Sequence, residues 1–350
     1  MTSKIHRRDS EQAQSLRREL NISQASALSL RYLCASAVSR SFLYPQLKFD
    51  PIKFLTISHI FLFACAFSLT VTAQTNARRT SVAVLDFGDK DFAARAADKL
   101  SIALSSNSEI VLIDREQSRA AARGIGYTGS LNMTLEEARD LGSAIGCDFF
   151  ITGDAQTVRR SPSNAAVYYE SYASIFIVSA RTGRLVFWDR PQFETPAPQD
   201  AEKKLLDELS QRAARYAAKI RAAEESERNE RALALEHNAP VIEDAPQDAN
   251  AAQGFREPQP FRRLRPPYTE EAASAEAEAT VDVLVDLDTQ GEVLNVSIAR
   301  WAGFGLDEAT INTVRQMHFR PAMRDGVPIS LRVLLRYNFR KPPKDARKTQ

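Results

Sequence analysis

Apolar and polar residues alternate most regularly in the last part of the chain. Val281, Val283, Val285 and Leu287 occupy every second position, which is the period of a half-buried β-strand. A second β-branched run follows the segment 288–291, whose glycine accepts a positive φ angle. This spacing predicts an antiparallel hairpin.

A short helix and a final strand complete this region. Apolar residues recur with helical spacing over 306–317, and Pro321 then stops the predicted helix. Gly326 marks a second turn, and the segment 330–339 is rich enough in Leu, Val and Tyr to form a last strand. The region is therefore predicted to be a compact β-β-α-β unit that acts as a recognition module.

Short apolar runs separated by helical segments characterise an earlier region. The helical segments show apolar residues three or four positions apart, and Thr134 and Glu137 have the spacing of a capping box at the start of one of them. The predicted buried strands are 81–87, 110–113 and 149–153.

A hairpin ends this earlier region. Segments 168–180 and 184–189 are joined through Gly183, which predicts an antiparallel pair. The order β-α-β-α-β-β-β predicts an α/β sandwich with a mixed sheet. The whole chain is thus expected to be an α+β protein.

A helical spacer connects the two regions. Its apolar stripe fades into a run of charged residues at 224–228, so the first half is expected to pack and the second half to be solvated. Prolines at 240, 246, 258 and 260 predict a flexible tether beyond it. The stripe consists of Leu205, Leu209, Ala213, Tyr216 and Ile220.

These patterns divide the chain into six segments. The predicted segments are a leader without core-forming periodicity at 1–53, a signal peptide or membrane anchor at 54–73, the α/β domain at 80–198, a helical then flexible linker at 199–257, the C-terminal domain at 258–341 and a basic tail at 342–350.

The segment 54–71 is mainly apolar and indicates export. It ends in small residues that favour cleavage between Ala73 and Gln74. Its length is also at the lower limit for a membrane-spanning helix, so a retained inner-membrane anchor is the alternative. Lipidation at Cys65 is a third outcome. The expected location is the periplasm, either free or anchored.

Composition argues against nucleic-acid binding and against catalysis. The chain has 46 basic and 44 acidic residues and no dominant basic patch. After the export segment only His237 and His318 remain, and Cys147 has no histidine in its domain. Aspartates 86, 114, 148 and 154 lie at strand ends without ligand spacing, which is typical of turn caps. We expect no enzyme activity, no cofactor and no metal.

The C-terminal region resembles the TonB C-terminal domain. The resemblance implies binding of extended segments of outer-membrane receptors by strand addition. The residues that carry it are Pro267-Tyr268, Gly291-Glu292-Val293, Gly305-Leu306-Asp307, Phe319-Arg320-Pro321-Ala322, Gly326-Val327-Pro328 and Tyr337-Asn338-Phe339.

The earlier region resembles the CsgG family and the amino-terminal domain of TolB over about 80–194. The resemblance implies a soluble fold that serves envelope assembly or protein contacts. The residues that carry it include Val82-Ala83-Val84-Leu85-Asp86-Phe87, Gly146-Cys147-Asp148-Phe149-Phe150-Ile151-Thr152-Gly153 and Ala180-Arg181-Thr182-Gly183.

Two functions fit these resemblances. With a retained anchor, the chain would contact an inner-membrane proton-driven motor complex and transduce energy to outer-membrane transport. With cleavage at Ala73, it would be a soluble periplasmic adaptor or assembly factor. In both cases an outer-membrane receptor or periplasmic protein is the expected partner, and a homodimer is a further option. The predicted partner-binding edge residues are Leu331, Val333, Leu335, Tyr337 and Phe339.

Overall fold

The computed structural model describes residues 79–341 apart from 165, 237–241 and 246–253. The leader, the export segment with its cleavage position at Ala73 and Gln74, and the basic tail lie outside the described residues. The described residues belong to one compact unit. No helix in the described part of the chain is both long and apolar enough to cross a bilayer.

The first sheet is mixed, as its sequence predicts. Its strand order is β2-β1-β3-β4-β5, with β6 paired to β4 beside β5. The strand β1 runs parallel to β2 and β3, and the remaining neighbours are antiparallel. The strands are β1 (Thr80–Val84), β2 (Ile110–Leu112), β3 (Phe149–Arg160), β4 (Tyr168–Ser179), β5 (Leu185–Asp189) and β6 (Gln192–Thr195).

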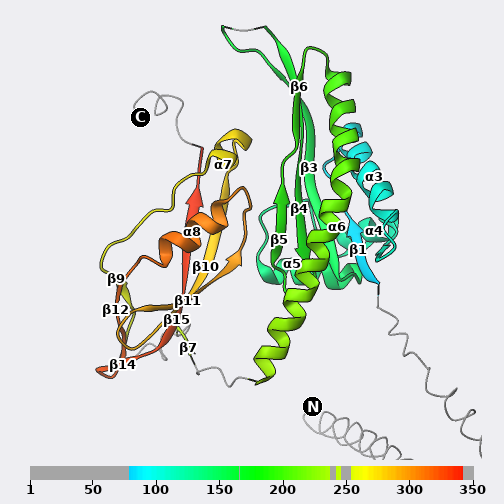
Figure 1. Cartoon of the computed structure of the whole chain (residues 1–350). Coiled ribbons are helices and arrows are strands. Elements are labelled where there is room, and N and C mark those ends of the chain that lie inside the picture. Colours follow the sequence, from blue (N-terminus) through cyan, green and yellow to red (C-terminus); the bar gives the residue numbers. More distant parts are fainter. Residues whose placement is uncertain (1–78, 165, 237–241, 246–253, 342–350) are drawn as a thin grey trace, which may run out of the picture. The chain divides into compact units, whose positions relative to one another are not determined.

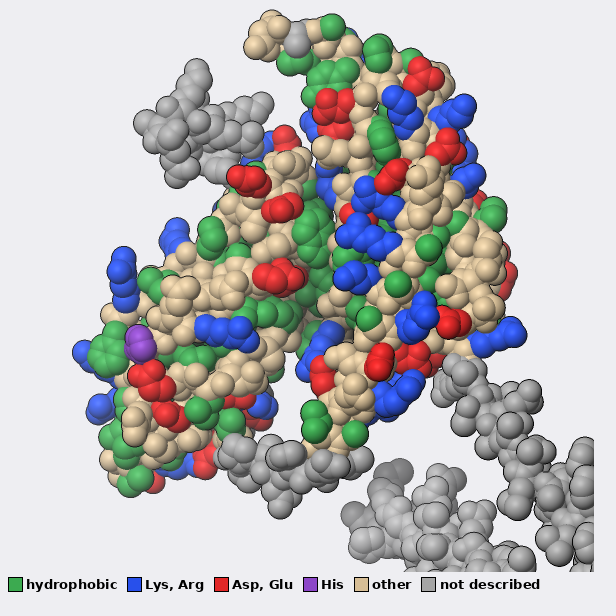
Figure 2. Space-filling view, in the orientation of Figure 1, with side chains coloured by type: hydrophobic (Ala, Val, Ile, Leu, Met, Phe, Trp, Pro, Cys, Tyr) green, Lys and Arg blue, Asp and Glu red, His purple; other side chains and the backbone are tan. Residues whose placement is uncertain are grey.

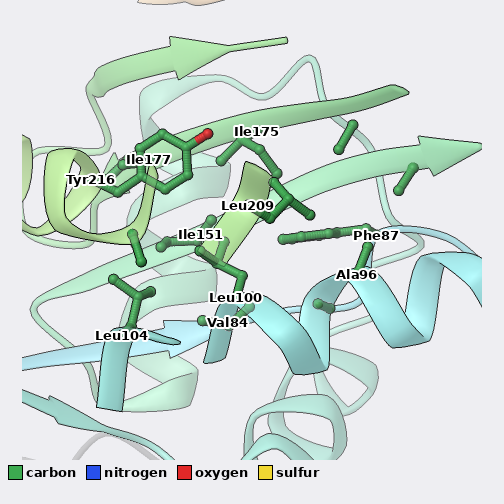
Figure 3. Packing of buried hydrophobic residues seen from close by; sticks show 14 of the residues in the cluster. Val84, Phe87, Ala96, Leu100, Leu104, Ile151, Ile175, Ile177, Leu209 and Tyr216 are labelled. Atoms are coloured by element: carbon green, nitrogen blue, oxygen red, sulfur yellow. The ribbon is translucent and has the colours of Figure 1, made fainter. Parts of the chain in front are cut away.

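Apolar cores cover both faces of this sheet. Along β1 and the residue after it, Val82 and Val84 belong to one core and Ala83 and Leu85 to the other, as strand alternation requires. Helices α3 (Asp91–Ser105) and α6 (Pro198–Glu236) close the first core (Figure 1). Helices α4 (Arg115–Gly124) and α5 (Leu135–Ile145) contribute to the second. Figure 3 shows side chains of α3 and α6, including Leu100 and Leu209, meeting those of the sheet.

The helix α6 is bound to the sheet along most of its length. Arg212 and the Tyr216 hydroxyl both donate hydrogen bonds to Asp189 at the end of β5. The expectation of a solvated second half was wrong for part of it, since Glu227 is 8 % exposed and accepts a hydrogen bond from Thr182 in the β4–β5 turn. A helix segment that is held by polar contacts of this kind has no apolar stripe, so the sequence pattern does not predict its packing.

The second sheet has the order β11-β10-β15-β7. Its core includes α7 (Glu270–Ala275) and α8 (Leu306–Val314), which pack on the apolar face of β10 (Ala279–Leu287). The other strands are β7 (Glu243–Asp244), β11 (Val293–Arg300) and β15 (Leu331–Phe339).

The predicted end of the C-terminal helix was wrong. The helix α8 stops at Val314, and Pro321 comes after the strand β12 (Phe319–Arg320) rather than at the helix end. The helix ends earlier because the amides of Gln316 and Met317 donate to the carbonyls three residues before them, those of Thr313 and Val314, and this turns the chain before Pro321.

Parts of the predicted flexible tether form short strands. The strand β8 (Phe255–Arg256) pairs with β13 (Ala322–Arg324), and β9 (Gln259–Pro260) pairs with β12. The strand β14 (Val327–Ile329) completes a turn with β13 through Gly326. Such two-residue pairings are too short to leave a periodic signal in the sequence.

Candidate partner-binding edge

Among the described residues, few lie beside the outer edge of β15. On one side the strand pairs with β10 from Leu331 to Phe339. On the other side β7 covers only Leu331 and Arg332. In the described part of the chain, β15 from Val333 onward therefore has a sheet neighbour on one side alone.

The direction of the free main-chain groups follows from two contacts. The carbonyl of Arg332 accepts a hydrogen bond from Ala245, so it points outward. Thr280 of β10 lies opposite Asn338, but its amide and carbonyl form hydrogen bonds with the Asn132 side chain and not with β15. The amide and carbonyl of Asn338 therefore point away from β10. Because alternate residues of an antiparallel strand face the same side, the even-numbered residues present their amides and carbonyls outward. These residues are Leu334, Arg336 and Asn338.

A groove of about 600 Å³ lies along this edge. One wall consists of consecutive residues of β15 from Leu334 to Phe339, as expected for a strand edge rather than a strand face. The other wall comes from the segment between Pro260 and Tyr268, with Met317 beside it. An extended chain laid in the groove would meet main-chain groups and apolar side chains together.

The five edge residues predicted from the sequence lie on β15, but their side chains belong to the core face. Leu331 is fully buried and Phe339 is 7 % exposed. Val333, Leu335 and Tyr337 are half-buried against the same core. The outward-facing set was missed because the sequence shows which side chains alternate but not which main-chain groups lack a neighbouring strand.

The other face of the sheet carries a ladder of ion pairs. Asp282 lies directly opposite Arg336, and the Arg336 Nε atom is 2.7 Å from the Asp282 carboxylate. Arg300 forms a second ion pair with the same carboxylate. Asp286 pairs in the same way with Arg332 at 2.6 Å. Burial alone would raise the pKa of Asp282, but the hydrogen bonds and charges of Arg336 and Arg300 outweigh it and lower the pKa.

The motif residues have structural roles in this domain. Gly291 has a φ of 84°, and a Cβ there would lie 2.0 Å from the Phe319 carbonyl oxygen. The Tyr268 hydroxyl lies 2.7 Å from the Ala277 carbonyl and 3.1 Å from the Ala272 carbonyl, and its single O–H proton is shared between them, which closes α7. Leu306 and Phe319 are core residues, Gly326 has a φ of 82° in the β13–β14 turn, and Pro321 joins β12 to β13.

Asp307 is the most perturbed of the motif residues. Burial raises the pKa of its carboxyl to about 7, against the opposing effect of hydrogen bonds donated by the amides of Ala302 and Gly303. The carboxyl thereby fixes the loop before α8 to the first turn of that helix. Its burial fits a structural role.

Residues 265–340 match the family model of the Gram-negative bacterial TonB protein C-terminal. This part of the chain is a TonB C-terminal domain. The match confirms the resemblance drawn from the motifs and supports a cell-envelope protein. No curated protein matches the sequence.

Several solved structures align with the chain at low similarity. The hypothetical protein CT253 from Chlamydia trachomatis has 12 % identity, a TM-score of 0.31, and coverage of 41 % of this chain and 99 % of its own. The LpoB C-terminal domain from Salmonella enterica has 16 % identity and a TM-score of 0.25, and the alignment covers 37 % of this chain and 92 % of that domain. The lipoprotein GNA1162 from Neisseria meningitidis has 12 % identity and a TM-score of 0.28, and the alignment covers 40 % of this chain and 98 % of that protein. The CsgG-like assignment of the earlier region stays a prediction.

One loop of the TonB C-terminal domain contacts the first sheet. Trp301 is 1 % exposed in the core on the α4–α5 face, and its ring stacks on Phe176 with 5.7 Å between centroids. The indole Nε1 donates to the Gly183 carbonyl at 3.1 Å. Asn132 binds both the Thr280 backbone and the Trp301 carbonyl. We call this contact the Trp301 joint.

The aspartates at the strand ends of the first domain are engaged in local contacts. Asp114 caps α4 by accepting a hydrogen bond from the Gln117 amide. Asp148 accepts from Ser81, and Asp86 forms ion pairs with Arg115 and Arg119. Within the described ranges no three His, Cys, Asp or Glu side chains come together as metal ligands.

The thiol of Cys147 is not activated. It is a free cysteine, and burial raises the pKa of the thiol to about 12. A thiol with a raised pKa is a poor nucleophile near neutral pH.

Proposed function

We propose that this chain is a cell-envelope binding protein whose TonB C-terminal domain captures an extended segment of an outer-membrane or periplasmic partner on β15. The observation that carries the proposal is the set of outward amides and carbonyls at Leu334, Arg336 and Asn338 beside an apolar groove. Strand addition supplies partners for these groups through main-chain hydrogen bonds. The mechanism contains no catalytic step, and no cofactor is required.

The rest of the molecule supports this role by holding the edge in place. The Trp301 joint connects the TonB C-terminal domain to a sheet with a core on each face. We propose that the first domain is a scaffold and that partner selection belongs to β15. Intramolecular pairing with β10 leaves the outer edge of β15 available for a second strand.

The decisive pair of variants is Leu334→Pro and Leu334→Ala. Proline removes one outward amide without removing a donor to β10, whereas alanine keeps the amide and removes only an exposed side chain. Binding of synthetic peptides from the periplasm-facing segments of the host's outer-membrane receptors should be lost in the first variant and retained in the second. Equal binding by a folded Leu334→Pro variant would contradict strand addition at this edge.

Energy transduction is the wider form of the proposal and depends on segment 54–71. If this segment stays in the inner membrane, force from a proton-driven complex can reach β15 through the chain. If cleavage occurs after Ala73, the protein binds partners as a soluble periplasmic adaptor. Mass spectrometry of the mature amino terminus, on membrane and soluble fractions from the host, separates the two.

A further inference from the structure

The β15 groove carries an excess of positive charge. Arg263 and Arg265 line one wall, and Arg336 and Arg340 extend from the other. None of the described residues that line the groove is acidic. An extended ligand in the groove would therefore pass between basic side chains on both sides.

Three of these arginines have no acidic partner among the described residues. Arg336 is paired with Asp282, but Arg263, Arg265 and Arg340 are exposed and form no ion pair in the described part of the chain. This differs from the ion-pair ladder on the same sheet, where each arginine contacts an aspartate. Among the described residues that line the groove, no carboxylate offsets the charge of these three arginines.

The groove is also apolar at its base. Leu264, Tyr268 and Met317 contribute side chains on one side, and Leu335 and Phe339 on the other. A ligand that fits both features alternates acidic and apolar residues, because successive side chains of a strand point to opposite faces.

Resting on the proposed strand addition, we infer that the partner of β15 is an extended acidic peptide segment with apolar residues at alternate positions. Main-chain pairing with Leu334, Arg336 and Asn338 provides the common affinity. The unpaired charges of Arg263, Arg265 and Arg340 select acidic segments over neutral and basic ones. Their contribution is screened by salt, since the side chains are exposed.

Three ten-residue peptides with the same valine and isoleucine positions test this inference on the full chain. They carry glutamate, glutamine or lysine at the alternate positions. Fluorescence anisotropy should show the glutamate peptide binding roughly tenfold more tightly than the glutamine peptide, and the lysine peptide most weakly. Raising the salt from about 0.1 to 1 M, where the Debye length falls to about 3 Å, should remove most of the difference.

The double variant Arg263→Glu/Arg265→Glu should reverse the preference between the glutamate and lysine peptides. The matched control is Arg262→Glu, which changes an exposed arginine of the same segment that does not line the groove. The control should keep the wild-type order. A reversal in the control as well would assign the preference to general surface charge and overturn the inference.

The remaining outcomes separate the inference from the proposed function. Equal, salt-insensitive binding of all three peptides, still lost in Leu334→Pro, would overturn acidic selection and leave strand addition intact. No peptide binding, with anionic vesicles bound through the same arginines, would overturn both in favour of a lipid surface. No peptide binding, with a dimer in wild type that Leu334→Pro dissociates, would assign the edge to a second copy of the chain.

Discussion

The two sheets of the molecule bury their strands in different ways. The first sheet has an apolar core on each face, and its central strands carry continuous apolar runs such as Phe149-Phe150-Ile151. The second sheet has an apolar core on one face and an aspartate–arginine ladder on the other. A sheet that is covered by an apolar core on both faces is suited to be a scaffold. A sheet with one ordinary polar face and an open edge is suited to present that edge to a partner.

Charge at the surface does not separate the two regions. Figure 2 shows acidic and basic side chains intermixed on the face drawn, in keeping with a formal net charge of +2. What distinguishes the second sheet is that Arg263, Arg265 and Arg340, which have no acidic partner among the described residues, line one groove together beside β15. Functional specificity is thus expected from the second sheet and stability from the first.

Trp301→Ala should have the largest effect on this comparison. Truncating a buried aromatic side chain lowers the free energy of unfolding by about 3–5 kcal/mol. In this chain the loss affects both the core of the first sheet and the contact that holds the TonB C-terminal domain to it. Limited proteolysis of the segment 237–254 should accelerate, and the thermal midpoint should fall. Phe261→Ala, at a side chain 68 % exposed, is the control and should change neither. An unchanged proteolysis rate in Trp301→Ala would show that the joint does not hold the domains together.

Leu209→Ala and Leu334→Ala compare the two regions with the same chemical change. Leu209 is fully buried on α6, whereas Leu334 is 54 % exposed on β15. The first variant should lose about 2–5 kcal/mol of unfolding free energy and the second less than about 0.5 kcal/mol. Chemical denaturation measures both, and similar losses would contradict the scaffold–edge distinction.

Asp282→Asn should have an intermediate effect that depends on pH. Because its folded-state pKa is lowered, the Asp282 carboxylate contributes stability above its unfolded pKa and loses it as the pH falls through the folded value. At pH 7 the variant should be less stable by about 1–3 kcal/mol, since Arg336 and Arg300 both lose the carboxylate that accepts their charge-assisted hydrogen bonds. Denaturation at pH 7 and pH 3 should show the difference shrinking in acid, and a constant difference would argue against the ion pairs.

Asp307 is expected to show the opposite pH dependence. Its pKa is raised from an ordinary value of 3.8 to about 7, so the folded state binds a proton more tightly than the unfolded state. Its contribution to stability is present below about pH 4 and decreases as the pH rises toward 7. Asp307→Asn should flatten the stability profile between these values while costing about 1 kcal/mol at pH 5. A wild-type profile that is already flat there would remove the basis for this assignment.

Much of the fold follows from local patterns, and the misses have physical reasons. Period-two alternation locates β10, and the Thr134 capping box is present as its spacing predicts. The strand β6 and the pairings of β7, β8 and β9 were missed because each rests on a few backbone hydrogen bonds without its own apolar face. The extension of β3 to Arg160 was missed because polar residues replace its apolar run.

The candidate site could be located from the sequence only to the level of the strand. Apolar alternation identified Leu331, Val333, Leu335, Tyr337 and Phe339, which are the residues that face the core. The groups free to pair with a partner belong to the residues between them. Their availability depends on which strands lie beside β15, and the convergence of Arg263 and Arg340 on one groove depends on a turn of the chain far from β15 in sequence.

Amide hydrogen exchange at β15 tests the central claim most directly. Without a ligand, the amides of Leu335 and Tyr337 should be protected by β10, and those of Leu334, Arg336 and Asn338 should exchange rapidly. Saturation with the glutamate peptide should slow exchange at the even-numbered residues and leave the odd-numbered residues protected as before. Protection that appears elsewhere, with these three amides still exchanging rapidly in the bound state, would contradict strand addition at β15.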